Sequence, residues 1–433
     1  MIVIRGNSRE ALEREGNRAI GLADNWCKQR KLEISVPKSG QILLKEKGEK
    51  RIQMDKRRPT IRLRGRTLQG LKATKYLGVT LATGQSYTEH LNRVANESVT
   101  TFNEITRSSK ANWGMGYKFL STIYECVFIP KITYAVAVWY EKVKSNASNF
   151  DKSRSAQLSV LRTAAKAYGT APAGALQVCT GKMPIDLKFC QKAAYYKIRK
   201  GEAVEVLNLR IGSEEVLANN TAARKQVDAR LMEEWQTRWD ASSTGRTTHE
   251  FFPSFARRLE YSIELDYYVT QFLTSHGGFD YCLLRFKARN FTRDTDECDC
   301  GQTETADHIL FEFPLIQRMR RKLIKVTVEI TGSWPCTKEN LVSDKRISKE
   351  FKKFAKRCDK AKAQHRLWCS QNQFDTVERQ LKSSSLLTEQ SNLDSTEDQT
   401  GGSIRESVPE SPCESKAQSQ CPELRSKASK RYR

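Results

Sequence analysis

The spacing of apolar residues changes along the chain from short alternating runs to helical intervals near residue 86. At the front, Asn7-Ser8 offers an N-cap for a helix that is predicted to end near Gln29. The apolar residues expected on its packing face are Leu12, Ala19, Ala23 and Trp26. The sequence thus predicts an amphipathic helix, and before it a strand over Met1–Ile4 that looks like the second arm of a hairpin whose first arm is absent.

Runs with a period of two follow this helix and predict strands, because successive side chains of a strand point to opposite faces. The predicted strands are Leu32–Val36, Gln41–Leu44, the two arms of a hairpin over Thr60–Leu68 with Gly65 at its turn, and Lys75–Leu81, which Gly78 interrupts. A helix followed by several short strands indicates an α+β arrangement for the first 88 residues.

From Ser86 to about Gly201, apolar and aromatic residues recur at helical intervals, which predicts a mainly helical domain. Residues 202–290 are also predicted to be mostly helical. The aromatic residues expected in the core of this second stretch are Trp235, Trp239, Phe251, Phe252 and Phe255. From about Thr376 the chain is rich in Ser, Glu, Gln and Thr. Such a segment buries too little apolar surface to offset the entropy of ordering, so we expect a disordered tail.

The charge of the chain favours a polyanionic partner. Its 433 residues include 74 Lys and Arg against 50 Asp and Glu, a formal charge of +24. Nucleic acid is the partner that such an excess most often serves, and a basic but idle surface is the alternative. No small-molecule substrate is evident from the sequence.

The sequence predicts an intracellular protein with no membrane segment. The longest apolar region, Val127–Tyr140, is interrupted by Pro130 and Lys131 and is too short to span a bilayer. The first residues do not resemble a signal peptide, and twelve scattered cysteines indicate a reducing compartment. We expect the nucleus, since the partner expected is nucleic acid.

A cluster of cysteine and histidine residues predicts a zinc site. Cys298, Cys300 and His308 supply three donors that a tetrahedral Zn²⁺ accepts, but Phe313 occupies the place of a fourth donor. Water, another chain or a remote cysteine, Cys282 or Cys336, would have to complete the shell. Alternatively, Phe313 fills the place of the metal as an apolar plug. No paired general base stands nearby, so zinc-dependent hydrolysis is not expected.

Basic residues directly after this cluster are the candidate nucleic-acid surface. The run comprises Arg318, Arg320, Arg321, Lys322 and Lys325. Helical spacing places several of these cations on one face, where they can follow phosphates without reading sequence. An ordinary solvated face is the alternative. A second basic run, Lys345–Lys362, has no neighbouring feature that suggests recognition.

In their order along residues 1–325, these blocks resemble the C-terminal half of a non-LTR (LINE-type) retrotransposon reverse transcriptase, of the arthropod kind that inserts into ribosomal RNA genes. The blocks that carry the resemblance are Gly6–Glu13, Trp26-Cys27, Pro59–Leu63, Lys75–Val79, His90, Ile129-Pro130, Ala175-Leu176, Pro184-Ile185 and Cys298–Pro314. The last block resembles the family's Cys-Cys-His-Cys knuckle, from which Phe313 departs.

The resemblance implies an α+β fold in which the C-terminal part of a palm is followed by mainly helical domains. The implied parts are a palm remnant (1–88), a helical thumb-like domain (89–200), a helical connection (201–290), a Cys/His knuckle with the basic run (291–330), a basic helical region (331–375) and the disordered tail (376–433). Tyr76, Leu77 and Gly78 resemble the turn that grips the primer end, although an ordinary edge hairpin would look the same.

The resemblance also bears on catalysis. Full-length family enzymes use two Mg²⁺ ions held by palm carboxylates, including those of an Ala-Asp-Asp turn. No Asp-Asp pair occurs in this sequence, so we assign no catalytic residue and expect the chain alone to be inactive. The expected role is to bind element RNA and target DNA within an RNA-directed DNA polymerase, a nucleotidyltransferase, during target-primed reverse transcription. The alternative is a stand-alone nucleic-acid-binding or scaffold protein derived from a decayed copy.

Overall fold

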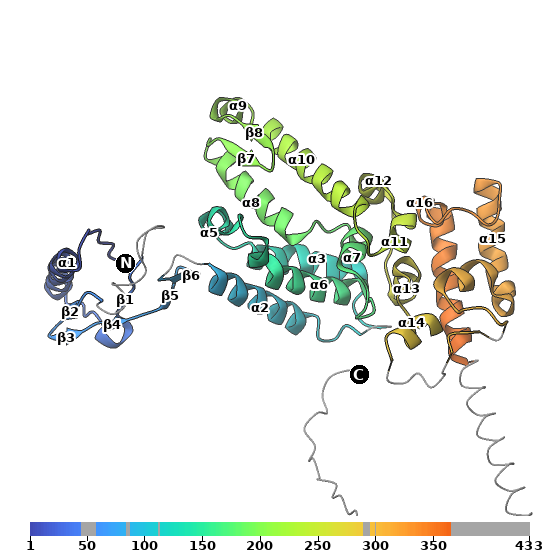
Figure 1. The fold of residues 1–433 in the computed structure, drawn as a ribbon, viewed down its shortest axis with the longest axis horizontal. Helices are drawn as coiled ribbons and strands as arrows, with labels where there is room; N and C mark the ends of the chain where they lie inside the picture. The colour runs from blue at the N-terminus through green and yellow to red at the C-terminus, as the bar shows by residue number, and fades with distance from the viewer. Residues whose placement is uncertain (45–57, 84–86, 111–112, 289–294, 299, 365–433) are drawn as a thin grey trace, which may run out of the picture. The chain divides into compact units, whose positions relative to one another are not determined.

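A computed structural model describes residues 1–44, 58–83, 87–110, 113–288, 295–298 and 300–364. Within these residues the chain is mostly helical, with four small two-stranded sheets, as expected for the α+β class at this level of detail (Figure 1). The predicted disordered tail, 376–433, and the end of the predicted basic helical region lie outside the described residues.

The N-terminal part combines one long helix with short strands around a small core of Ile61, Leu63 and Leu68. Its elements are α1 (Arg9–Gln29), β1 (Gly40–Gln41), β2 (Arg62–Leu63), β3 (Arg66–Thr67), β4 (Gln69–Gly70), β5 (Ala73–Tyr76) and β6 (Val79–Ala82). Strands β1 and β4 pair in parallel, whereas β2–β3 and β5–β6 are antiparallel hairpins. The predicted hairpin over 60–68 is thus confirmed.

Helix α1 begins at the predicted N-cap, where the Ser8 hydroxyl accepts the backbone N–H of Ala11 at 3.1 Å. At Gly16 the helix lies close to Ile61, the residue before β2: a Cβ atom on Gly16 would be 2.4 Å from Ile61 Cδ1. One turn of helix beyond Ile20, the buried Asp24 pairs with Arg64 at 2.8 Å. Trp26, predicted on the packing face, is instead 51% exposed, because the face that contacts β2 runs through Gly16 and Asp24.

The strand predicted over Met1–Ile4 is absent, and two further predicted strands are wrong. Residues 32–35 form no strand, and a 3₁₀ turn, Val36–Lys38, ends this segment. Of the second segment, only Gln41 pairs, as part of β1, while 42–44 are irregular. Alternation predicts a strand only where a partner strand lies alongside, and β4 meets the chain at Gly40-Gln41 alone.

The predicted strand over 75–81 is a hairpin, β5–β6, whose two-residue turn is Leu77-Gly78. Both turn residues have positive φ, 44° and 82°, as in the turns that match the twist of paired strands. Two side chains from later in the chain hold this turn, Tyr134 from another turn and Arg93 from a helix. The Tyr134 hydroxyl donates to Leu77 O at 3.0 Å, and Arg93 Nη2 donates to Gly78 O at 2.6 Å.

The remainder of the described chain is a large helical region. Its elements are α2 (Thr88–Ile105), α3 (Tyr117–Ile123), α4 (Ile129–Ile132), α5 (Val136–Val143), α6 (Asp151–Ala165), α7 (Ala173–Thr180), α8 (Ile185–Arg199), β7 (Val204–Val206), β8 (Leu209–Ile211), α9 (Ser213–Ala218), α10 (Asn220–Asp240), α11 (Arg246–Phe251), α12 (Phe255–Glu260), α13 (Tyr267–Thr274), α14 (Asp280–Arg285), α15 (Gln317–Thr331), α16 (Asn340–Ser343) and a helix over 345–364. Residues 202–290 were predicted to be mostly helical, and the antiparallel hairpin β7–β8 is a part of this stretch that is not helical.

One continuous core joins these helices. Helix α2 packs on α6, and α8 packs on both α5 and α10 (Figure 1). All five aromatic residues predicted for the core of the second helical stretch are buried in it. The core extends from Leu91 to Cys358, so it includes the helix over 345–364.

A buried glutamine links four segments of this region. Gln157, on α6, has no exposed surface and makes hydrogen bonds in both directions. Its Nε2 donates to the Tyr124 hydroxyl at 2.8 Å and to Met183 O at 2.7 Å, and its Oε1 accepts from Gln177 Nε2 at 2.9 Å and from the N–H of Ile185 at 3.0 Å. Both ends of the amide are therefore satisfied, as burial requires.

No single described helix has the length and apolar content needed to cross a bilayer. A pair of segments, 117–132 and 136–143, meets those criteria together but bends by 69° between them. Phe128, Ile132 and Trp139 of this pair are buried in the core.

The turn of the β5–β6 hairpin predicts a difference between two glycine substitutions. We expect Gly78→Ala to destabilise the protein by about 2 kcal/mol or more, because Ala is strained at positive φ and its Cβ would lie 2.8 Å from the Tyr134 ring. Gly65→Ala, at φ 76° but with open space around it, is the matched control and should cost about 1 kcal/mol. Denaturant unfolding measures both changes. Equal losses of unfolding free energy in the two variants would show that the Tyr134 ring adds no steric cost at Gly78.

A buried histidine predicts a loss of stability in acid. His90 Nδ1 accepts the N–H of Thr80 at 3.2 Å, and burial, aided by the charge of Arg93, lowers the pKa of His90 from 6.5 to about 4. Between pH 6.5 and about 4, His90 is therefore protonated in the unfolded chain but neutral in the folded chain, so the free energy of unfolding falls as the pH falls through this range.

We expect the unfolding free energy of the wild type to fall more between pH 6.5 and 4 than that of His90→Asn, which keeps an acceptor but does not titrate. Denaturant unfolding at a series of pH values tests this, with carboxylate titration common to both proteins. Parallel curves would exclude His90 as the cause.

Candidate metal centre and nucleic-acid interface

The two cysteines lie in a tight turn between α14 and α15. An isolated bridge between Glu297 and Thr303 closes this turn, and the N–H of Cys298 donates to Gln302 O at 2.8 Å. Gly301 adopts φ 81° in the turn, where a Cβ would be strained. The backbone thus returns on itself and brings both thiols to one side.

His308 enters the same site from a π-helical turn, His308–Glu312. Its Nε2 lies 3.3 Å from Cys298 Sγ and 3.2 Å from Cys300 Sγ, and the two sulfur atoms are 2.7 Å apart. Cys298 and His308 are buried, whereas Cys300 is exposed. The three residues predicted as ligands therefore converge, with one side open to solvent.

The geometry fits a zinc ion in part. Ideal Zn–S and Zn–N lengths give tetrahedral edges of about 3.8 Å between sulfurs and about 3.5 Å between sulfur and nitrogen. The two sulfur–nitrogen separations approach that value, while the sulfurs would have to separate by about 1 Å. Burial, followed by the neighbouring Cys300 thiol, raises the pKa of Cys298. A cation at this point would offset that cost of forming the thiolate.

Glu312, which was not among the residues predicted for the site, contacts the other nitrogen of His308. Its Oε2 lies 3.2 Å from His308 Nδ1. A carboxylate in this position favours the tautomer with the proton on Nδ1, which leaves the Nε2 lone pair facing the thiols. The sequence contains the pair as His-x-x-x-Glu. This spacing brings the two side chains together only because both residues lie in one π-helical turn.

Phe313 lies beside the cluster as a packed aromatic residue. It is buried, and its ring centroid is 5.6 Å from that of His308. Among the described residues, the converging set consists of Cys298, Cys300 and His308 alone. Cys282, proposed as a remote fourth ligand, donates its thiol to Ser275 O at 3.1 Å, and Cys336 is not in the set either.

The basic run after the cluster lies on α15, where some of its side chains are exposed and one is buried. The exposed members are Arg318, Arg321, Lys322 and Lys325. Arg320 is 3% exposed and donates from Nη2 to Ile309 O at 2.9 Å and to Phe313 O at 3.1 Å. The expectation that Arg320 contributes to a surface is therefore wrong, because its guanidinium anchors α15 to the turn that carries His308.

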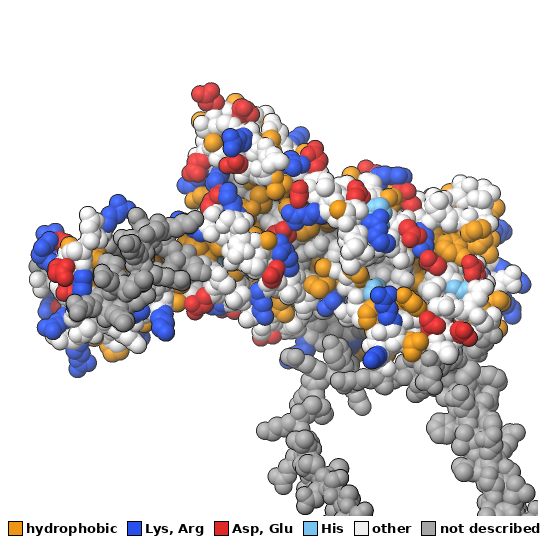
Figure 2. All heavy atoms as spheres, in the orientation of Figure 1, with side chains coloured by type: hydrophobic (Ala, Val, Ile, Leu, Met, Phe, Trp, Pro, Cys, Tyr) orange, Lys and Arg blue, Asp and Glu red, His pale blue; other side chains and the backbone are white. Residues whose placement is uncertain are grey.

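The second basic run forms an amphipathic helix over 345–364. Phe351, Phe354 and Cys358 enter the core from it, while the exposed cations on its other side are Lys345, Arg346, Lys349, Lys353, Lys356, Arg357 and Lys360. Near its end, Lys362 pairs with Glu304, a buried residue in the loop before His308. On the face visible in Figure 2, basic side chains are dispersed among acidic ones and do not gather in one large patch.

Tyr76, Leu77 and Gly78 occupy the tip of the β5–β6 hairpin. Leu77 is 75% exposed at this tip, and Tyr76 is exposed as well. The hairpin contacts α2, whereas the cysteine turn lies between α14 and α15, so the two predicted sites belong to different elements.

Comparison with known proteins identifies relatives of this chain. A Nasonia vitripennis protein named "Retrovirus-related Pol polyprotein from type-1 retrotransposable element R1 4" is 27% identical over 340 residues, which are 75% of this chain and 84% of that protein. "Putative 115 kDa protein in type-1 retrotransposable element R1DM" from Drosophila melanogaster is 29% identical over 324 residues. An R1 Pol polyprotein of Bradysia coprophila is 29% identical over 323 residues.

The chain spans less than a third of the Drosophila and Bradysia proteins. No protein-family model matches it, and no solved structure matches it. The resemblance drawn from the sequence is nevertheless confirmed: the homologues of this chain are insect R1 retrotransposon proteins, Pol polyproteins among them, and the chain matches the C-terminal portion of such an arthropod element.

Proposed function

We propose that this chain is the nucleic-acid-binding, non-catalytic C-terminal portion of a retrotransposon RNA-directed DNA polymerase. It would bind RNA and DNA, the element transcript and its target, during target-primed reverse transcription in the nucleus. The relatives support this proposal because several are named Pol polyproteins of R1 elements. In this proposal residues 1–88 are a palm remnant, 89–200 a thumb-like domain and 201–290 a connection, and Tyr76, Leu77 and Gly78 form a primer-grip-like turn.

The observation that carries the proposal is the link between the cysteine–histidine cluster and the basic helix. Cys298, Cys300 and His308 would hold a Zn²⁺ ion, and the chemistry it supplies is structural, since it fixes the turn that precedes α15. Arg320 joins that turn to α15 through two carbonyl groups. The metal and the exposed cations of α15 would therefore act as one unit, which presents positive charge to a phosphate backbone.

Zinc binding is tested with the purified protein and a chromophoric chelator in competition. We expect about one Zn²⁺ per chain, and Cys300→Ser should abolish that binding because only two donors remain. Glu312→Gln should weaken it by about tenfold, since the carboxylate orients the His308 ring.

Glu329→Gln is the matched control for Glu312, because Glu329 lies on α15 and pairs with Arg346 at 3.3 Å. It should leave zinc affinity unchanged. Binding that survives in Cys300→Ser would show that the metal sits elsewhere. An equal loss in both glutamate variants would exclude an orienting role for Glu312.

Nucleic-acid binding is tested by the salt dependence of affinity for single-stranded RNA. Replacing Arg318, Arg321, Lys322 and Lys325 together by Ala should reduce the slope of log affinity against log salt by about 3, because each phosphate contact releases about 0.7 of a counterion. Fluorescence anisotropy at several salt concentrations gives the slope.

The matched control removes the same charge from the helix over 345–364. Its four substitutions are Lys345→Ala, Lys349→Ala, Lys356→Ala and Lys360→Ala, all at exposed positions. If α15 forms the interface, this control should change the slope by less than about 1. Equal reductions would mean that total charge, and not α15, governs binding.

A further inference from the structure

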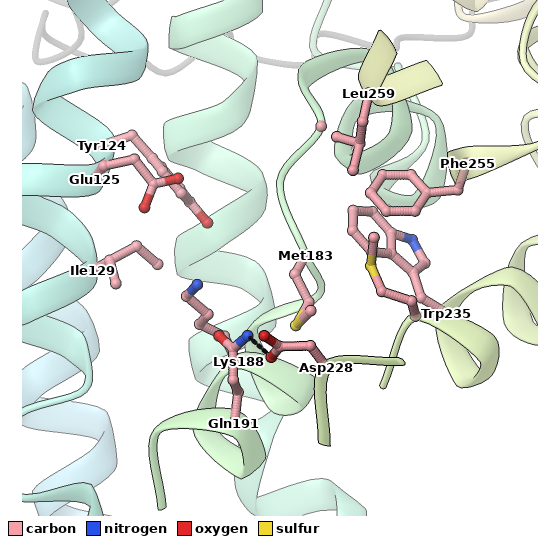
Figure 3. Close-up of a pocket in the computed structure, with 12 residues that line it drawn as sticks. Tyr124, Glu125, Ile129, Met183, Lys188, Gln191, Asp228, Trp235, Phe255 and Leu259 are labelled. Carbon is pink, nitrogen blue, oxygen red and sulfur yellow. Dashed lines mark hydrogen bonds between the residues drawn. The ribbon is translucent and has the colours of Figure 1, made fainter. Parts of the chain in front are cut away.

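A cavity of about 280 Å³ lies within the helical region, away from the cysteine turn, and is lined by α8, α10, α12 and the π-helical turn Tyr124–Phe128 (Figure 3). Trp235, Phe255 and Leu259 form one apolar wall, and Tyr124 and Ile129 stand opposite. Lys188, Gln191 and Asp228 form a polar floor between them (Figure 3). The volume lies at the lower end for ligand sites, which suits a single ring system.

The aromatic walls are fixed by their neighbours. The Trp235 and Phe255 rings are in contact, with centroids 3.5 Å apart. The Tyr124 hydroxyl accepts from the buried amide of Gln157 at 2.8 Å. Rigid aromatic walls favour a flat ligand, because stacking then costs little conformational entropy.

The carboxylate of the floor is held in place before any ligand arrives. Asp228 Oδ1 accepts from Gln191 Nε2 at 2.7 Å, and the Tyr195 hydroxyl lies 2.7 Å from Oδ1 and 2.6 Å from Oδ2. A carboxylate has about four lone-pair positions, so Asp228 retains capacity to accept from a ligand.

Lys188 supplies a donor to the same cavity. It lies one turn before Gln191 on α8, and Figure 3 shows its Nζ directed into the cavity. Burial lowers the pKa of Lys188, partly opposed by the charge of Glu125. A ligand oxygen that accepts from the ammonium group would replace the water lost by burial.

We propose that this cavity binds one guanine base, an inference that rests on the proposed function and gives it a base-specific contact. Guanine presents the O6 acceptor next to the N1–H and N2–H donors, which matches a lysine and a carboxylate that line one cavity. Adenine, cytosine and uracil each present a different order of donors and acceptors on that edge. Unstacked bases of single-stranded RNA are recognised in this way, by stacking on aromatic residues and hydrogen bonds to the base edge.

Calorimetric titration of the whole chain with the four ribonucleoside monophosphates tests the proposal. Guanosine monophosphate should bind at least about tenfold more tightly than the other three, the effect of one hydrogen bond to a charged group. Asp228→Asn and Lys188→Met should each remove this preference, because each takes away one partner of the guanine edge. Lys192→Met, an exposed lysine on α8, is the matched control and should retain it.

Decamers of RNA with and without guanine distinguish a base within a strand from a free nucleotide. If the guanine-containing decamer binds more tightly and Asp228→Asn loses this preference, the ligand of the pocket is a guanine within an RNA strand. If only guanosine monophosphate is preferred, the ligand is a free nucleotide. Equal affinity for all four monophosphates, or a guanine preference that survives in Asp228→Asn, would overturn the proposal. Salt-dependent RNA binding without any guanine preference would overturn only the proposal that the cavity binds guanine. If the chain showed neither RNA binding nor a guanine preference, the proposed function would be overturned as well.

Discussion

The amide of Gln157 is the constraint on which the helical region depends. It bonds to four segments while wholly buried, so none of them can shift without leaving a polar group unpaired. Two of its partners, Tyr124 and Met183, also line the cavity between α8 and α10. Gln157 thus holds two lining residues of that cavity in place without lining it itself.

The sequence predicted helices more reliably than strands, and the reason is physical. A helix satisfies its hydrogen bonds within one segment, so the apolar spacing around Leu91 and Val94 suffices to place α2. A strand needs a partner, and the alternation around Leu32 carries no information about what lies beside it. Likewise, the apolar character of Trp26 could not show that α1 packs through Gly16.

The candidate site was predictable where it rests on residue type and short spacing. Cys298, Cys300 and His308 could be grouped because few side chains bind zinc and the three lie close in sequence. Arg320 could not be separated from its exposed neighbours, since the packing of α15 against the turn before it decides which side faces inward. The role of Glu312 depends in the same way on the backbone of the π-helical turn.

The helix over 345–364 makes the core of the helical region depend on residues late in the chain. Phe351 and Phe354 fill the common core, and Lys362 is paired with Glu304 next to the histidine turn. A frameshift or stop codon ahead of position 345 would therefore expose the core and supply the cell's proteases with an unfolded chain.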